Sequence, residues 1–224
     1  MSYTPNVTPS PTTTKGDLIV RGTSVDVRLG VGSDGQSVKS DANSTNGLAW
    51  FTSGMGNFSY VSGRYYGSTN SLALTSASNT LGVMYATPVY IWKRQAFTAI
   101  GINATVAVAS NIRMGIYADS GGVPGSRIID CGVAALSLGV TGQYDVAISQ
   151  TLDIGNYWLV VLGDTAGNTL SAISTNSLQF LGTNGGAGTA PRIQKTQAYG
   201  ALPTPFGSAT YSEGNSSMNI QLKV

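Results

Sequence analysis

The sequence predicts an all-β protein in which a small N-terminal β module precedes a larger β-sandwich of the jelly-roll type. Short runs of β-branched and aromatic residues recur along the 224-residue chain, and turn residues, including 29 glycines, separate them. No stretch has convincing helical periodicity. Apolar and polar side chains alternate with a period of two, most clearly where Met218, Ile220, Leu222 and Val224 share one face of a strand.

Composition restricts the classes of function. Charged residues make up 10% of the chain, against about 25% in typical domains, so Ser, Thr, Asn and Gln must supply most of the surface polarity. The net charge is only +2 and the basic residues are scattered, which argues against nucleic-acid binding. We expect no membrane insertion, because no apolar run approaches the ~18 residues that a spanning helix needs. No signal peptide is evident after Met1, which predicts assembly in a cytoplasm.

Side chains required by most catalytic and metal sites are missing. The chain has no histidine, which excludes Ser-His-Asp triads and the commonest zinc sites. Cys131 is the single cysteine, so we expect a buried thiol and no intrachain disulfide. Paired carboxylates could cleave a glycosidic bond, but the main candidates lie near predicted strand ends, where capping of turns is their ordinary role: Asp119, Asp130, Asp145, Asp153 and Asp164. We expect no enzyme activity, cofactor or metal.

Residues 1–14 are rich in proline and threonine, which favours an extended arm without internal hydrogen bonds. Two interpretations remain open for this arm. It is either a flexible terminus or a peptide that docks into a neighbouring protein.

Residues 15–50 contain four short predicted strands, at residues 17–20, 25–29, 36–40 and 48–51. The dipeptides Asp34-Gly35 and Asn46-Gly47 have the chemistry of hairpin turns, since these residues tolerate positive φ. An isolated sheet of such short strands is marginally stable in water. Oligomerisation is therefore expected.

The order of short motifs in this module resembles a pattern that recurs in bacteriophage fibre proteins. The matching pieces are Lys15-Gly16-Asp17-Leu18-Ile19-Val20, Arg28-Leu29-Gly30-Val31-Gly32, Asp34-Gly35-Gln36-Ser37-Val38, Asp41 and Gly47-Leu48-Ala49-Trp50. The resemblance implies a homotrimeric attachment element of a virion, whose arm contacts other virion structural proteins. The assembly residues that it implies are Lys15, Gly16, Asp17, Leu18, Asp34, Gly35, Gln36 and Trp50.

Residues 51–63 contain several glycines and are predicted to be a linker, and residues 64–224 a β-sandwich head domain. Residues 157–162 are apolar on both faces, which predicts a central strand with Trp158 in the core. Residues 113–132, 148–152 and 155–160 resemble parts of a sandwich domain of phage structural proteins and some bacterial surface proteins, in which the domain is usually terminal and exposed. Residues 182–191 and 198–211 are expected to be long loops, where binding surfaces usually lie.

Four aromatic residues outside the clean alternation are candidate contacts with a host-surface glycan or receptor: Tyr66, Trp92, Tyr199 and Phe206. Exposed rings stack on the apolar faces of sugars. The alternative is that these rings pack at a core edge or a subunit contact.

Together these patterns predict a virion fibre or spike on the exterior of a phage particle, with the sandwich available for host attachment. A capsid decoration, cement or head-fibre protein that stabilises the particle without binding a receptor is the second interpretation. A polysaccharide depolymerase is the third.

Overall fold

The computed structural model describes residues 15–33, 36–52, 59–68, 74–174, 192–212 and 216–224. Every regular element among these residues is a β-strand, so the predicted all-β class is confirmed. The chain divides into two compact units, Met1–Phe58 and Ser59–Val224.

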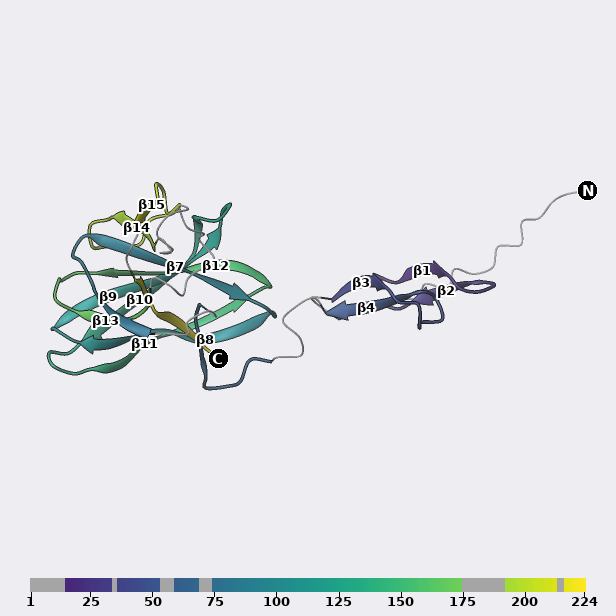
Figure 1. Ribbon diagram of the computed structural model, residues 1–224, viewed down its shortest axis with the longest axis horizontal. Coiled ribbons are helices and arrows are strands. Elements are labelled where there is room, and N and C mark those ends of the chain that lie inside the picture. Colours follow the sequence, from purple (N-terminus) through teal and green to yellow (C-terminus); the bar gives the residue numbers. More distant parts are fainter. Residues whose placement is uncertain (1–14, 34–35, 53–58, 69–73, 175–191, 213–215) are drawn as a thin grey trace, which may run out of the picture. The chain divides into compact units, whose positions relative to one another are not determined.

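The N-terminal unit contains two antiparallel hairpins (Figure 1). Strand β1 (Leu18–Arg21) pairs with β2 (Asp26–Leu29), and β3 (Gln36–Ser40) pairs with β4 (Leu48–Thr52). All four strands lie within one residue of their predicted bounds. The β3–β4 connection closes with a hydrogen bond from the Asp41 amide to the Gly47 carbonyl (2.8 Å), and Gly47 has φ +71°. The predicted turn at Asp34-Gly35 lies outside the described residues.

The second unit holds the remaining strands, which pack as two layers (Figure 1). They are β5 (Tyr65–Tyr66), β6 (Leu74–Ser78), β7 (Val83–Ile91), β8 (Gln95–Val106), β9 (Ser110–Asp119), β10 (Pro124–Leu136), β11 (Gly142–Leu152), β12 (Gly155–Gly163), β13 (Thr169–Ile173), β14 (Arg192–Thr196), β15 (Thr210–Ser212), β16 (Ser217–Met218) and β17 (Ile220–Lys223).

Eight of these strands form nested antiparallel pairs that alternate between the two sheets. Strand β9 pairs with β10, β8 with β11, β7 with β12, and β6 with β13. Because β12 also pairs with β9, and β13 with β8, the two sheets run β7-β12-β9-β10 and β6-β13-β8-β11. A long hairpin folded over in this way is a jelly roll, which agrees with the sequence prediction.

The other strands extend these sheets. Strands β14 and β15 continue the first sheet beyond β7, and β17 pairs with β8 on the edge that β8 shares with β13. Strand β5 pairs with β17, and two further hydrogen bonds join Gly63 and Arg64 to Val224. The sandwich unit therefore includes residues 59–63, which the sequence analysis assigned to a linker.

A hydrophobic core fills the space between the sheets. Strand β12 illustrates how the alternation builds it, because Leu159 and Val161 point into this core from the middle of the first sheet. Trp158, Val160 and Leu162 point the other way and form a second buried cluster on the outer face of the same sheet. The prediction that this strand is buried on both faces is confirmed.

The segment between β14 and β15 covers the outer cluster. Leu202 and Phe206 insert into it, and the Tyr117 hydroxyl donates to the Pro203 carbonyl (2.7 Å). The Phe206 amide in turn donates to the Gly125 carbonyl (2.9 Å). This segment is irregular, as expected for a long loop, but its apolar side chains serve the core.

Candidate functional site

Asp17 fastens the start of β1 to the end of β2 in the N-terminal unit. Its side chain is 0% exposed, and one carboxylate oxygen forms an ion pair with Arg28 Nε at 2.8 Å. The other oxygen accepts a hydrogen bond from the Val31 amide at 3.0 Å. Gly16 precedes it with φ +92°, a conformation that L side chains rarely adopt. Gly16 and Asp17 of the fibre-like motif therefore stabilise the hairpin of β1 and β2 within a single chain.

Trp50 makes the second fastening, between the two hairpins. Its indole Nε1 donates to the Gly30 carbonyl at 2.6 Å, and a Cβ at Gly32 would stand 2.6 Å from the ring. Glycine is therefore needed at position 32 for the close approach of Trp50. Gln36 completes the arrangement, because its side-chain oxygen accepts from the Ser33 amide at 2.7 Å.

The hairpin of β1 and β2 has one apolar and one polar face. Directly paired residues of antiparallel strands point to the same side, and Leu18 pairs with Leu29 as Val20 pairs with Val27. The opposite side carries Ile19, Arg21, Asp26 and Arg28. We call the four residues Leu18, Val20, Val27 and Leu29 the apolar row.

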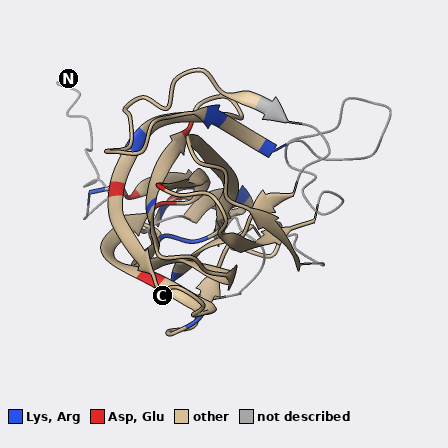
Figure 2. Cartoon of the chain, turned by 90° about the vertical axis from the view of Figure 1, so that its left-hand side faces the viewer, with Lys and Arg blue, Asp and Glu red and all other residues tan. Residues whose placement is uncertain are grey.

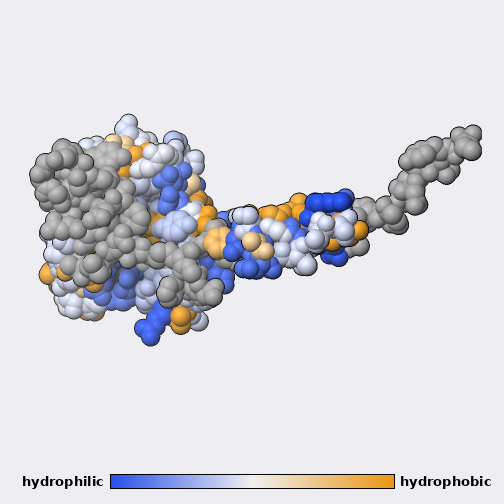
Figure 3. Space-filling view, turned by 45° about the vertical axis from the view of Figure 1, so that its right-hand side comes forward, coloured by the Kyte–Doolittle hydropathy of each residue, from blue (hydrophilic) through white to orange (hydrophobic). Residues whose placement is uncertain are grey.

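None of the described hydrophobic residues of the N-terminal unit is buried, although its strands are regularly paired. Leu18 is 40% exposed, and the other members of the apolar row are half-buried. Figure 3 shows apolar residues at the surface of this unit. Lys15 is exposed as well, whereas Asp34 and Gly35 lie outside the described residues. The unit lacks a core of its own among the described residues.

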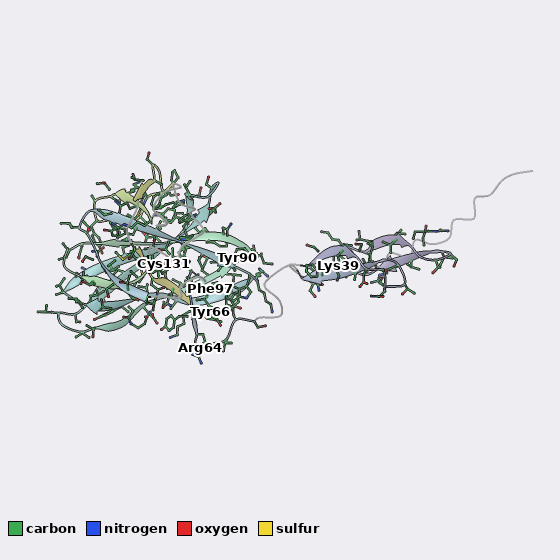
Figure 4. All side chains as sticks on the ribbon, viewed as in Figure 1. Lys39, Arg64, Tyr66, Tyr90, Phe97 and Cys131 are labelled. Carbon is green, nitrogen blue, oxygen red and sulfur yellow. The ribbon has the colours of Figure 1, made fainter. Side chains whose placement is uncertain are left out.

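Two of the four candidate glycan contacts come together in the sandwich unit. The rings of Tyr66 and Trp92 lie 5.5 Å apart between centroids, and Tyr60 stacks on Trp92 at 4.2 Å. Tyr60 also contacts Phe97 of the main core edge-on. Figure 4 shows Tyr66, Tyr90 and Phe97 at the same end of the sandwich. One face of Trp92 is thus covered, and the arrangement is that of rings packed at a core edge.

The other two candidates lie on the outer cluster. Tyr199 is half-buried and packs against that cluster, where burial raises its pKa. Phe206 is 0% exposed and packs edge-on against Tyr117 at 5.5 Å. The expectation of a glycan contact at Phe206 is therefore wrong, because a ligand cannot reach its fully buried ring.

A pocket of about 160 Å³ opens where β7, β9 and β12 meet the turn after β9. It is lined by Pro88, Val89, Tyr90, Asp119, Gly122, Asn156 and Trp158. Trp158 Nε1 donates to Asp119 Oδ1 at 2.8 Å, and the Gly122 amide donates to Asp119 Oδ2 at 3.2 Å. Sequence reasoning missed this site, because its residues come from three separate segments. The signal that the sequence offers for this pocket is Tyr90, an aromatic residue that does not belong to a clear alternation of apolar and polar residues.

The other carboxylates serve the fold in several ways. Asp130 lies inside β10, not at a strand end, and pairs with Arg113 at 2.8 Å while accepting from the Leu202 amide at 3.0 Å. Asp145 likewise lies inside β11, where it accepts from the Tyr65 hydroxyl at 2.6 Å. Asp164 caps the start of β9 through the Asn111 amide. Charged side chains are sparse overall (Figure 2).

Cys131 is buried, which agrees with the sequence prediction, and burial raises its thiol pKa to about 12. Among the described residues, no three His, Cys, Asp or Glu side chains gather as a group that could hold a metal ion. No helix in the described part of the chain is long and apolar enough to cross a membrane. No protein-family model, curated protein or solved structure matches this chain.

Proposed function

We propose that the protein is a bacteriophage virion fibre or spike protein. In this proposal it is a homotrimer, its N-terminal arm attaches it to other virion proteins, and its jelly-roll sandwich faces the host surface. One observation carries the proposal. The N-terminal unit has regular strands and two internal hydrogen-bonded contacts, yet none of its described hydrophobic residues is buried and one face of its first hairpin is entirely apolar.

Self-association gives this unit the core that a single copy lacks. Burying an exposed Leu or Val side chain contributes about 1.5–3 kcal/mol, and each copy offers the four side chains of the apolar row. Two-stranded hairpins gain independent stability only when such a face is covered. The likeness of residues 15–50 to a phage fibre motif supports a trimer as the assembly and a virion as its location.

Mass measurement and a pair of adjacent variants test the trimer. Light scattering of the purified full-length protein is expected to give three times 23.1 kDa. Leu18→Asp places a charge in the apolar row and is expected to release monomers. Ile19→Asp is the matched control, because Ile19 is 49% exposed on the opposite face of the same strand. A monomeric parent protein, or equal behaviour of the two variants, contradicts the proposed assembly.

Competition distinguishes attachment from decoration of the capsid. Purified protein added to host cells before the phage is expected to block adsorption if the sandwich contacts the host. Fragile particles with normal adsorption after deletion of the protein would instead assign it a stabilising role.

A further inference from the structure

We propose that the pocket lined by Tyr90, Asp119, Asn156 and Trp158 binds one uncharged pyranose ring of a surface glycan. The inference rests on the proposed host-attachment function for the source of this ligand. It also moves the expected glycan contact away from the aromatic residues that sequence reasoning selected.

The strand register places the pocket residues on one face of the sheet. Pro88 pairs with Trp158, Trp158 pairs with Tyr117, and Tyr90 pairs with Asn156. Paired residues share a face and lie about 4.5–5.5 Å apart at Cβ. Pro88, Tyr117 and Trp158 form the inner row, which is buried. The next row outward offers Tyr90 and Asn156 to solvent.

Asp119 follows Tyr117 by two residues and therefore points to the same face. Its carboxylate is held in place by the Trp158 indole and the Gly122 amide, one donor on each oxygen. A carboxylate has about four acceptor positions, so about two remain for hydroxyl groups of a ligand. Two acceptors fixed in one plane suit neighbouring hydroxyl groups on a ring.

Tyr90 and Asn156 supply an apolar surface and a hydrogen-bond donor, which the Asp119 carboxylate lacks. The half-buried Tyr90 ring offers an apolar surface for the C–H face of a sugar, and the exposed Asn156 amide offers both a donor and an acceptor. Pro88 and the 2% exposed Trp158 close the apolar floor. An aromatic wall beside a few fixed polar groups is the usual composition of a small-ligand site.

Charge and volume restrict the ligand further. The lining includes one carboxylate and no Lys or Arg, so an anionic sugar would meet repulsion without a compensating cation. The pocket volume of about 160 Å³ is below the about 300–1,000 Å³ of sites for drug-sized ligands. One ring, such as the terminal unit of a branch, matches this size.

Titration calorimetry of the full-length protein with methyl glycosides tests the proposal. The probes are the methyl pyranosides of glucose, galactose, mannose and N-acetylglucosamine. For any sugar that binds, the next probe is the methyl glycoside of the corresponding uronic acid, whose carboxylate is free and ionised. We expect saturable binding of at least one neutral glycoside and at least about tenfold weaker binding of the matching uronate. No saturable binding by any of the four probes, or equal binding of sugar and uronate, overturns the proposal.

Variants then locate the binding site. Asn156→Ala is expected to weaken binding about fivefold through the loss of one hydrogen bond, and Tyr90→Leu at least as much. Gln143→Ala, which removes an exposed amide on the other sheet, is the matched control and should bind like the parent protein. Unchanged affinity in Asn156→Ala and Tyr90→Leu overturns the assignment to this pocket. Asn156→Ala removes only an exposed side chain, so loss of the fold is not expected to obscure its result.

Light scattering on the same samples separates the two proposals. A trimer that binds none of the sugars contradicts the pocket inference and leaves the fibre proposal standing. A monomer whose sugar binding is weakened in Asn156→Ala contradicts the fibre proposal and supports the pocket.

Discussion

Replacing Asp17 by asparagine is expected to destabilise the hairpin of β1 and β2 in the N-terminal unit. The carboxylate is fully covered and accepts from both Arg28 Nε and the Val31 amide. Asparagine keeps one acceptor oxygen but turns an amide N–H₂ group toward the guanidinium. Hydrogen bonds to charged groups contribute about 1.5–3 kcal/mol. Since Arg28 is 40% exposed, solvent screening reduces this, and we expect a loss of about 2 kcal/mol.

Hydrogen exchange measured by mass spectrometry is the suitable assay, because it reports local opening in the intact protein. A loss of about 2 kcal/mol corresponds to exchange about 30-fold faster in the peptides that cover β1, β2 and Val31. Peptides from the sandwich unit serve as the internal reference and should be unchanged.

Asp26→Asn is the matched control in the same hairpin. Asp26 pairs with Arg21 at 3.0 Å, but the two side chains are 59% and 70% exposed. Exposed pairs contribute about 0–1 kcal/mol, so exchange should rise by less than about fivefold. If Asp17→Asn and Asp26→Asn accelerate exchange equally, the reasoning from burial is refuted.

Two further predictions concern the sandwich. Phe206→Ala should lower the free energy of unfolding, measured by urea denaturation, by about 3–5 kcal/mol. The reason is that it leaves a cavity at a fully buried site beside Tyr117. A loss below about 1 kcal/mol would contradict the burial of Phe206 in the core. Cys131 should resist a disulfide reagent at pH 8 until denaturant is added, since burial raises its pKa from 9.0 to about 12. The folded state keeps the neutral thiol, so its contribution to stability is present below pH 9 and is lost as the pH rises toward 12. Rapid labelling of the native protein would refute this.

Local patterns predicted the strands well where turn residues bound them. The four short strands of the N-terminal unit and the alternation from Met218 to Val224 were visible because Gly, Asp and Asn mark the turns. Strand β14 was missed, since its sequence Arg-Ile-Gln-Lys-Thr is mostly polar and only Ile193 is buried. Its pairing with β7 is a tertiary interaction that local propensity does not contain.

The candidate site could be predicted only in part. Asp17 and Trp50 were recognised by their motif, but their partners Arg28 and Gly30 emerge only from the folded hairpins. Phe206 was misread because a loop that covers the outer face of a sheet has the same sequence character as an exposed loop. The pocket could not be predicted from the sequence, because only the register of the strands brings Tyr90, Asp119 and Asn156 together.

The nested strand pairing has a consequence for the order of folding. Strands β9 and β10 are separated by a short turn, whereas β6 and β13 are separated by most of the domain. Closing an inner pair shortens the loop that the next pair must close, so we expect the sandwich to form from the centre outward. The pairing of β17 with the central β8 comes late, because β17 is synthesised after all the nested pairs. Until β17 has paired, part of one edge of β8 can form hydrogen bonds with other chains. We therefore expect the risk of aggregation to be greatest before β17 is synthesised and paired.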